Sequence, residues 1–377
     1  MNLLDDIEEV KKRDTIGNFD LFRQWPNKLR ETFSRGRSIA IPSNIRFGRN
    51  SRVLKYHDTY SAICLCGMGG SAISGDFIAS ICSSLNFEVP VYVIRGYRLP
   101  SWVSPKNLVI AVSYSGDTRE TLSCVQQALE KSIPVLLVSS GGFLKTLSTK
   151  FKIPWIELTA GLVPRAAFPV IIGALLGVFE ALFPSLRFSS LIENIDAPIL
   201  AVLDTYGPEV PMPLNKIKHL ATRLTQRMPI VMTTEQAIGM RWKGQLNENS
   251  KVFAFYDVFP ESMHNSIESW QNGRAKEFEF IVVKLKQDGT EMVEKMQNAL
   301  ALALPQTTIT PTVLEFASES RLGDLLAAAL TGDLLSVYLA FLLGEDPSKT
   351  PLLTKIKTEF DLKLNQQFNP KKALLDL

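Results

Sequence analysis

The sequence predicts an α/β protein with two parallel sheets, each covered by helices. Between about residues 60 and 185, short apolar segments alternate with segments of helical periodicity, and the same rhythm returns after about residue 215. The expected strands are continuously apolar, which is typical of a parallel sheet covered on both faces. A chain of 377 residues is also too long for one ordinary core. Together these observations predict two α/β domains.

The first domain is expected to contain five strands and four helices. The predicted strands are 62–66, 89–94, 108–112, 135–138 and 153–157. The predicted helices are 75–83, 118–131, 142–150 and 165–183. The apolar stretch 168–183 contains Pro169 and Glu180 and is too short for a clean membrane span, so we expect a buried helix and no membrane partner.

The remaining chain divides into an arm, a linker and a second domain. We predict an N-terminal helical arm (1–50, with a turn near Pro42), a first domain (51–190) and a second domain (205–377), with the linker near 188–204. In the second domain the predicted strands are 229–232, 252–256, 277–285 and 312–315. The predicted helices are 215–228, 234–246, 262–270, 292–303 and 321–343, the last interrupted at Gly332. The arm is expected to pack on the first domain or on a second copy of the chain.

A glycine-rich turn follows the first predicted strand. It reads Cys66-Gly67-Met68-Gly69-Gly70-Ser71 and leads toward the helix expected from Gly75. Glycines let a backbone approach a ligand closely, and the N–H groups of a helix start attract anions. The turn lacks the ending of a Walker loop and the G-x-G-x-x-G spacing of a dinucleotide fingerprint. Taken alone, it is more typical of a tight strand-to-helix connection than of a binding site.

A second junction carries hydroxyl groups. Ser113, Ser115 and Thr118 follow the strand 108–112, and Asp117 with Glu120 resembles a capping box of the next helix. The hydroxyls would then lie where the helix dipole favours an anion, although Ser and Thr are also ordinary turn residues. Two such junctions in one open sheet favour a ligand crevice at the strand ends.

Both loops resemble motifs of the bifunctional phosphoglucose/phosphomannose isomerase family. Residues 66–76 are similar to the family's G-M-G-G-S-A-I-G-G-D, and residues 113–121 to its S-Y-S-G-N-T-E-E-T. The resemblance continues in order from about residue 50 to 360. It implies two tandem sugar-isomerase (SIS) domains, each a flavodoxin-like three-layer sheet. It also implies a metal-independent isomerase, without cofactor, that interconverts glucose 6-phosphate and fructose 6-phosphate through an enediolate and also accepts mannose 6-phosphate.

The resemblance assigns residues to the phosphosugar substrate. Those that would hold the phosphate are Gly70, Ser71, Ser113, Ser115 and Thr118. Thr350 matches a family threonine near the second carbon of the sugar, where it would leave room for the mannose epimer.

Two acid–base residues follow from the same match. Glu248 lies in Gln-Leu-Asn-Glu-Asn, similar to the family's Q-L-N-E-N, and would move the proton between the two carbons. By spacing alone, a glutamate at a helix end is more often solvated surface. His264 lies in a segment that resembles N-H-N-E-I-x-G-W and would open the sugar ring. In the wider superfamily this histidine reaches the neighbouring subunit's site, which implies a homodimer. By position alone, it is more often a cap or a surface residue.

Two cations complete the implied site. Arg165, in Pro-Arg-Ala-Ala-Phe-Pro, would stabilise the enediolate, although an arginine at a helix start is otherwise a snorkelling surface residue. Lys357 would share ring opening with the histidine, and Lys349 and Lys355 are close competitors for that role.

Three residues depart from the family pattern. Ser74 stands where glycine is common and would be strained at a positive φ. Asp117 replaces an asparagine, and its carboxylate would repel a phosphate unless it caps the helix. Met263 replaces the asparagine before the histidine.

Composition narrows the remaining alternatives. The formal charge of +3 with no basic tract disfavours nucleic acid, and three histidines disfavour a zinc enzyme. Four cysteines without metal-ligand spacing favour buried free thiols and a reducing cytoplasm. A phosphosugar-sensing protein without turnover is the alternative to the isomerase. An amidotransferase-type isomerase domain is disfavoured, because no cysteine follows Met1.

Overall fold

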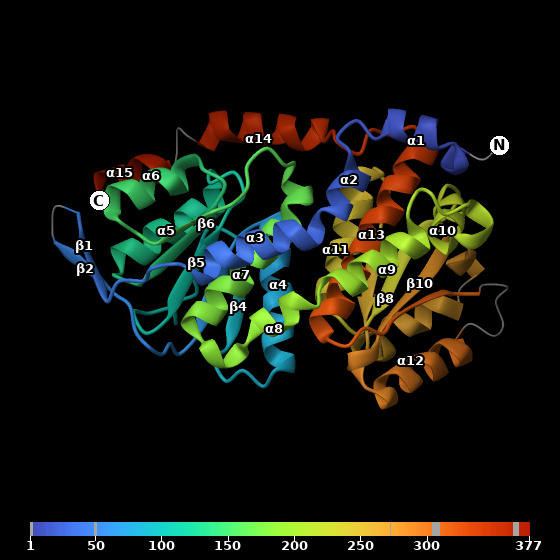
Figure 1. Ribbon diagram of the computed structural model, residues 1–377, viewed down its shortest axis with the longest axis horizontal. Helices are drawn as coiled ribbons and strands as arrows, with labels where there is room; N and C mark the ends of the chain where they lie inside the picture. Colours follow the sequence, from blue (N-terminus) through green and yellow to red (C-terminus); the bar gives the residue numbers. More distant parts are fainter. Residues whose placement is uncertain (1–2, 49–50, 272, 304–309, 365–368) are drawn as a thin grey trace. The chain divides into compact units, whose positions relative to one another are not determined.

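The computed structural model describes residues 3–48, 51–271, 273–303, 310–364 and 369–377. The chain forms two compact units, and each is assembled from two separate segments (Figure 1). Unit 1 comprises Met1–Gln24 with Glu193–Thr350, and unit 2 comprises Trp25–Ile192 with Pro351–Leu377. The predicted α/β class is confirmed, because each unit contains a parallel sheet flanked by helices.

These units divide the chain differently from the predicted ranges 1–50, 51–190 and 205–377. The N-terminal segment is shared, because Phe19 stacks on Tyr338 of unit 1 whereas α3 (Trp25–Arg37) packs on α7 (Phe168–Leu182) of unit 2. The contact between α3 and α7 is close: a Cβ at Gly36 would lie 2.2 Å from the carbonyl oxygen of Ala174. The C-terminal segment also belongs to unit 2.

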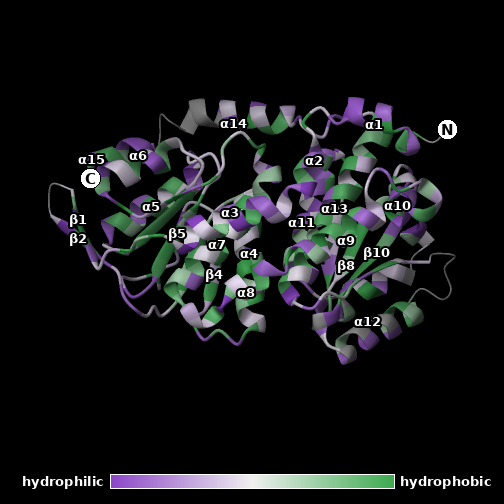
Figure 2. Cartoon of the chain, in the orientation of Figure 1, coloured by the Kyte–Doolittle hydropathy of each residue, from purple (hydrophilic) through white to green (hydrophobic). Residues whose placement is uncertain are grey.

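The sheet of unit 2 has five parallel strands in the order β4-β3-β5-β6-β7. The strands are β3 (Ile63–Cys66), β4 (Val91–Ile94), β5 (Leu108–Val112), β6 (Val135–Ser139) and β7 (Trp155–Glu157). Every residue of β3, β5 and β6 is buried. All of these residues are apolar except Ser139, at the end of β6. Figure 2 shows these strands mainly in the hydrophobic colour. The order is that of a flavodoxin-like sheet, as the resemblance implied.

Helices cover both faces of this sheet. Figure 1 shows α5 and α6 on one side, and α3, α4 and α7 on the other. Their bounds, with the C-terminal helices, are α4 (Gly69–Ser84), α5 (Arg119–Glu130), α6 (Gly142–Phe151), α14 (Pro351–Leu364) and α15 (Pro370–Asp376). Right-handed crossovers in opposite directions from β3 explain this distribution. An antiparallel pair, β1 (Asn44–Phe47) and β2 (Arg52–Lys55), follows the turn in the arm that was predicted to be helical.

Unit 1 repeats the strand order of unit 2 with four parallel strands. They run β11-β10-β8-β9, with bounds β8 (Met228–Thr233), β9 (Phe255–Val258), β10 (Phe278–Leu285) and β11 (Thr312–Phe316). The main helices of this unit are α1 (Ile7–Arg13), α2 (Asn18–Arg23), α9 (Asp196–Tyr206), α10 (Lys216–Leu224), α11 (Gln236–Asn249), α12 (Thr290–Ala303) and α13 (Arg321–Leu343). The predicted linker is itself largely helical, since it forms α8 (Phe188–Glu193) and most of α9.

The predicted interruption of α13 at Gly332 is wrong. The helix is continuous from Arg321 to Leu343, because Gly332 serves packing and not a break. A Cβ at Gly332 would lie 2.5 Å from the indole nitrogen of Trp242, which donates a hydrogen bond to the carbonyl oxygen of Ala328 at 2.9 Å. The missing side chain therefore lets α11 and α13 approach closely.

Two helical segments of the described chain are long and apolar enough to cross a membrane. They are Pro164–Leu182 and Arg321–Leu343, and their apolar windows are 78% and 94% buried, respectively, inside the structure. Such burial is what a core helix of a globular unit requires, so their apolar composition is explained by packing.

The four cysteines are free and buried, as the sequence predicted. Burial raises the pKa of Cys64 and of Cys82 to about 12. Both thiols therefore stay protonated at neutral pH and act as small apolar groups.

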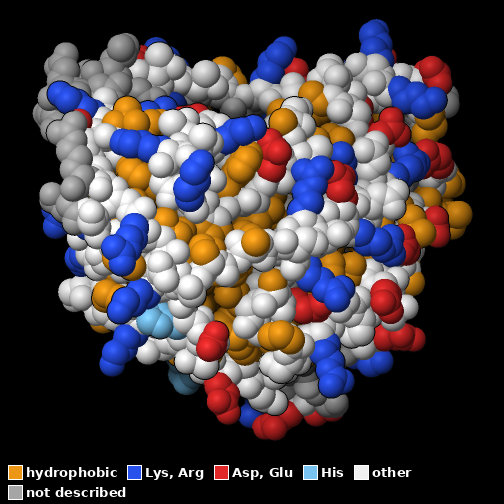
Figure 3. All heavy atoms as spheres, turned by 60° about the vertical axis from the view of Figure 1, so that its left-hand side comes forward, with side chains coloured by type: hydrophobic (Ala, Val, Ile, Leu, Met, Phe, Trp, Pro, Cys, Tyr) orange, Lys and Arg blue, Asp and Glu red, His pale blue; other side chains and the backbone are white. Residues whose placement is uncertain are grey.

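Charged side chains of both signs are mixed on one face of the molecule. On the face shown in Figure 3, Lys and Arg side chains are spread among acidic and hydrophobic ones. This distribution agrees with the small net charge of +3.

Replacement of Gly332 tests the contact between α11 and α13. Gly332→Ala is expected to lower the free energy of unfolding by about 1–2 kcal/mol, because the clash with Trp242 outweighs the better helix propensity of alanine. Urea denaturation followed by circular dichroism measures the change. Gly273→Ala is the control, since a Cβ there meets open space. Equal stability of the two variants would contradict the packing role.

Candidate functional site

The glycine loop begins at the end of β3. The helix α4 begins at Gly69, six residues before the predicted start at Gly75, so Gly70 and Ser71 lie in its first turn. The low helix propensity of two adjacent glycines hid this start. Gly69 has a φ of +50°, and Met68 at the N-cap provides no side-chain cap. The first backbone N–H groups of a helix have no acceptor within the helix, so they are available to bind an anion.

The hydroxyl loop begins at the end of β5, where Ser113 is its centre. Ser113 is 1% exposed, and its Oγ lies 2.8 Å from Thr118 Oγ1 and 3.5 Å from Ser115 Oγ. The same Oγ accepts the backbone N–H of Gly116 at 3.1 Å. The predicted convergence of three hydroxyls at a strand end is therefore present in the structure.

The two loops lie side by side because β3 and β5 are neighbours. Cys66 pairs with Ala111, and a Cβ at Gly67 would lie 3.1 Å from the carbonyl oxygen of Val112. The chain leaves β3 toward β4 on one side, and β5 leads to β6 on the other, so the strand order reverses here. Ligands of open α/β sheets bind at such a reversal.

The segment carrying Arg165 is attached to both loops. The hydroxyl of Tyr114 donates to the carbonyl oxygen of Thr159 at 2.9 Å and accepts the N–H of Leu162 at 2.8 Å. A Cβ at Gly70 would lie 3.4 Å from the carbonyl oxygen of Pro164, the residue before Arg165. Burial raises the pKa of Tyr114, which keeps its hydroxyl protonated as a donor. Sequence reasoning missed this residue, although it stands between two selected serines.

The departures from the family pattern have local explanations. Ser74 lies inside α4, where its backbone does not have a positive φ, so the strain considered above is absent. Its hydroxyl donates to the carbonyl oxygen of Gly70 at 2.9 Å. Met263 packs against the apolar cluster around Trp270 and Phe280. The asparagine of the family is thus replaced by a side chain that adds to a core.

Asp117 does not cap the helix that follows it, so the capping-box interpretation is wrong. The N-cap of α5 is Thr118, which makes no side-chain cap hydrogen bond. The carboxylate of Asp117 instead accepts the N–H of Phe143 at 3.3 Å and an ion pair from Lys371. It turns toward α6 because Gly142 allows close approach there.

In unit 1, Glu248 lies in the last turn of α11 and is half-buried. Neighbouring residues fix this turn: Asn249 donates to Ser336 Oγ at 2.9 Å, and Ser250 donates to the carbonyl oxygen of Ser336 at 2.6 Å. Glu248 is therefore less exposed than a glutamate at a helix end usually is. The turn is held on the buried helix α13.

Lys251 joins the Glu248 turn to the Gly-x-Asp-Pro segment. Its Nζ donates to the carbonyl oxygens of Glu248 at 2.7 Å, Asn249 at 3.1 Å and Asp346 at 3.0 Å. A cation at a helix C-terminus is favoured by the dipole. Thr350 follows Asp346 in the same unit. Sequence reasoning did not single out Lys251, because a lysine after a helix has no distinguishing pattern.

His264 ends the 3₁₀ helix Glu261–His264 and is exposed. The predicted helix 262–270 is thus two short 3₁₀ helices, the second being Ser266–Gln271. Trp270, 2% exposed, anchors the segment in the apolar cluster of unit 1. The backbone is fixed while the imidazole faces outward.

The lysine candidates belong to two units. Lys357 is an exposed residue of α14 in unit 2. Lys355 lies 3.9 Å from Glu359 in the same helix, and Lys349 pairs with Asp346 at 3.2 Å in unit 1. These contacts do not select between the three.

The strand order of unit 1 also reverses, between β8 and β10, and acidic side chains follow both strands there. Glu235 follows β8 and Asp288 follows β10, and Arg321 binds both at 2.5 Å and 3.1 Å. All three side chains are less than a fifth exposed. An anionic ligand would meet two acidic groups here, whereas unit 2 offers hydroxyls and a glycine loop. The candidate phosphate site is therefore in unit 2, where Gly70, Ser71, Ser113, Ser115, Thr118 and Arg165 belong to adjoining segments.

Comparison with known proteins places this geometry in context. Residues 214–360 match the bacterial phospho-glucose isomerase C-terminal SIS domain. A bifunctional phosphoglucose/phosphomannose isomerase of Caldicellulosiruptor bescii is 33% identical over 331 residues, which cover 85% of this chain and 95% of that protein. A protein of the same name from Aquifex aeolicus is 29% identical over 304 residues, covering 80% and 90%.

A solved structure shares the fold. The C-terminal domain of glucosamine-fructose-6-phosphate aminotransferase from Francisella tularensis superposes with a TM-score of 0.65 at 14% identity, covering 87% of this chain and 96% of that chain. At this identity the likeness concerns the fold alone, and it agrees with the tandem SIS arrangement.

Removal of the Ser113 hydroxyl tests the architecture of the hydroxyl loop. Ser113→Ala is expected to lower the free energy of unfolding by about 1–2 kcal/mol, because the hydroxyl of Thr118 loses its buried partner at 2.8 Å. The N–H of Gly116 also loses one acceptor, although it keeps the carbonyl oxygen of Ser113 at 2.9 Å. Chemical denaturation measures this change. Ser115→Ala is the matched control, since Ser115 is exposed and its loss should cost at most about 0.5 kcal/mol. A larger loss for Ser115→Ala than for Ser113→Ala would show that the loop is organised differently.

Proposed function

This chain belongs to the bifunctional phosphoglucose/phosphomannose isomerase family, and on that basis we propose that it interconverts glucose 6-phosphate and fructose 6-phosphate and also accepts mannose 6-phosphate. The observation that carries the proposal is the convergence of Ser113, Ser115 and Thr118 beside the glycine loop at the strand reversal of unit 2. Hydroxyls and a helix start suit the phosphate dianion shared by the three sugars.

Catalysis requires a proton transfer between two adjacent carbons. We assign it to Glu248, whose turn is fixed by Asn249, Ser250 and Lys251. Glu248 would remove the proton from the second carbon of the open aldose and return it to the first carbon. Arg165 would stabilise the negative oxygen of the enediolate between the two transfers. The route needs no metal.

The substrate must first be opened from its ring. We assign this step to His264 and Lys357, which would move protons to and from the ring oxygen and the anomeric hydroxyl. Thr350 is proposed to lie near the second carbon and to leave room for both epimers. The exposed position of His264 supports its delivery to the site of a neighbouring subunit, and so a homodimer.

We propose a cytoplasmic location. Four buried free cysteines suit a reducing compartment, since none is paired in a disulfide.

An assay with each phosphosugar tests the proposed reaction. The purified protein, in the presence of EDTA, is expected to convert fructose 6-phosphate to glucose 6-phosphate and to mannose 6-phosphate. Glu248→Gln should lower kcat by about 10³-fold or more, because the amide cannot accept the proton. Glu294→Gln, an exposed carboxylate of α12 in the same unit, is the control and should keep full activity.

Two results would overturn these assignments. Binding of the sugars without turnover by the wild-type protein would support the phosphosugar-sensing alternative. Turnover retained in Glu248→Gln would remove that residue from the role of base while leaving the reaction in place.

Mixed dimers test the sharing of the site between subunits. Glu248→Gln and His264→Ala are each expected to be inactive as homodimers. A dimer with one protomer of each kind, isolated by two affinity tags, contains one site with both native residues if His264 crosses the interface. It should therefore regain about half of the wild-type rate per dimer. An inactive mixed dimer would show that each site uses its own histidine.

A further inference from the structure

A carboxylate lies within the proposed phosphate site. Asp117 stands between Ser115 and Thr118, and its backbone N–H donates to Ser115 Oγ at 3.3 Å. The side chain is 44% exposed, so its charge acts on the surrounding water and on any ligand of the loop. An uncompensated carboxylate would repel a phosphate dianion. The chain must therefore offset this charge for the loop to bind phosphate well.

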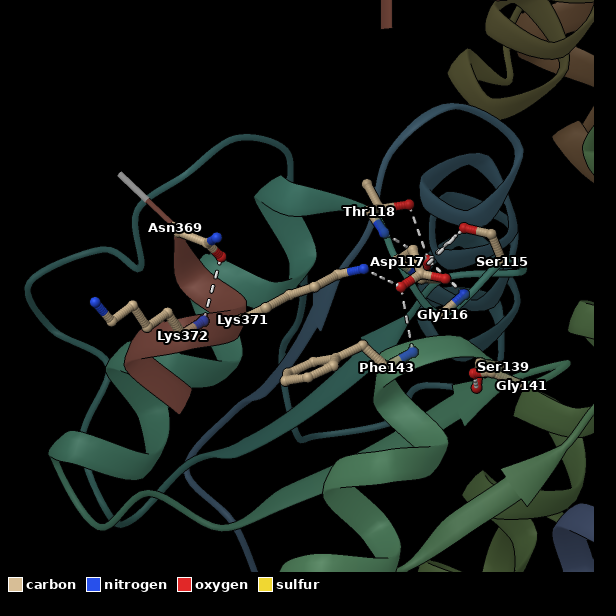
Figure 4. A network of polar contacts seen from close by, with 11 residues as sticks. Ser115, Gly116, Asp117, Thr118, Ser139, Gly141, Phe143, Asn369, Lys371 and Lys372 are labelled. Carbon is tan, nitrogen blue, oxygen red and sulfur yellow. Dashed lines mark hydrogen bonds and ion pairs between the residues drawn. The ribbon is translucent and has the colours of Figure 1, made fainter. Parts of the chain in front are cut away.

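Lys371 provides the opposite charge from the far end of the sequence. Its Nζ lies 2.5 Å from Asp117 Oδ1, and 5.6 Å from the centre of the Phe143 ring. Figure 4 shows the side chain extending from α15 along Phe143 to the carboxylate, while the adjacent Lys372 points the other way. The same Oδ1 accepts the N–H of Phe143, so the carboxylate joins three segments of unit 2.

The helix that carries Lys371 is fixed on unit 2. Asn369 caps it by accepting the N–H of Lys372 at 3.2 Å. Pro370 and Leu374 are buried, and Lys150 of α6 donates to the carbonyl oxygen of Leu375 at 2.5 Å. An exposed lysine on a docked helix loses less side-chain entropy in an ion pair than one on a free tail. The position of Lys371 is thus prepared by the fold.

We propose that Lys371 is a positioning residue of the phosphate site, which acts through Asp117. It offsets the carboxylate charge beside Ser115 and Thr118 and holds Asp117 turned toward Phe143 of α6. Its ligand class is the phosphate monoester dianion, and the proposal rests on the proposed function of this site. Lys371 matters for the affinity of the phosphate and not for the proton transfers.

Kinetics of single and double variants test this role. Lys371→Ala should raise KM for fructose 6-phosphate on the order of five- to tenfold with little change in kcat, because the phosphate is held equally in the ground state and the transition state. Lys371→Arg should restore most of the affinity. Lys372→Ala is the matched control, since it removes an exposed lysine from the same helix and should leave KM unchanged.

A double-mutant cycle separates charge cancellation from structural damage. Asp117→Asn should lower KM by about twofold, because the amide keeps an acceptor for Phe143 without the charge. In that background, Lys371→Ala should raise KM by less than about twofold, because no carboxylate remains for Lys371 to hold toward α6. A full five- to tenfold rise in both backgrounds would contradict action through Asp117.

The outcomes distinguish this proposal from the proposed function. An active wild-type enzyme whose KM is the same in Lys371→Ala and Lys372→Ala would overturn the role of Lys371 alone. A wild-type protein without turnover would overturn the proposed function. Titration calorimetry with inorganic phosphate then tests Lys371 directly: weaker binding by Lys371→Ala than by Lys372→Ala supports it, and equal binding contradicts it.

Discussion

The parallel pairing of β3 with β5 is the constraint on which the candidate phosphate site depends. The pair places the turn after Cys66 beside the turn after Val112, and the reversal of strand order leaves their carboxyl ends uncovered by a crossover. Ser113 then organises its loop from a buried position, through two hydroxyls and a backbone N–H. Tyr114 extends the same loop to the segment before Arg165. Sheet pairing, not any single side chain, therefore determines the position of the candidate site.

The two units show how one strand order can support different chemistry. Both sheets reverse at the central pair of strands, β3 with β5 in unit 2 and β8 with β10 in unit 1. In unit 1 the strand ends at the reversal carry Glu235 and Asp288, and both carboxylates form ion pairs with Arg321.

Much of the fold could be predicted from the sequence, because period and apolar content report directly on buried parallel strands. The strands around residues 62–66 and 108–112, and the hydroxyls that follow the second, were predicted for this reason. Packing between distant segments could not be predicted in the same way. A glycine such as Gly332 usually indicates a break in a helix. Only the position of Trp242 in the structure shows that this glycine makes room for a packing contact. Asp117 has the spacing of a cap, and its real partner, Lys371, lies 254 positions away in sequence.

The division of the chain into interleaved segments has a consequence for biosynthesis. Unit 2 begins at Trp25 but contains Pro351–Leu377, so a ribosome must complete all of unit 1 before the last helix of unit 2 emerges. Neither unit can be finished as an independent N-terminal product during translation. The carboxylate of Asp117 is thus synthesised 254 positions before Lys371, and the hydroxyl loop carries an unbalanced acidic group until that lysine has been added.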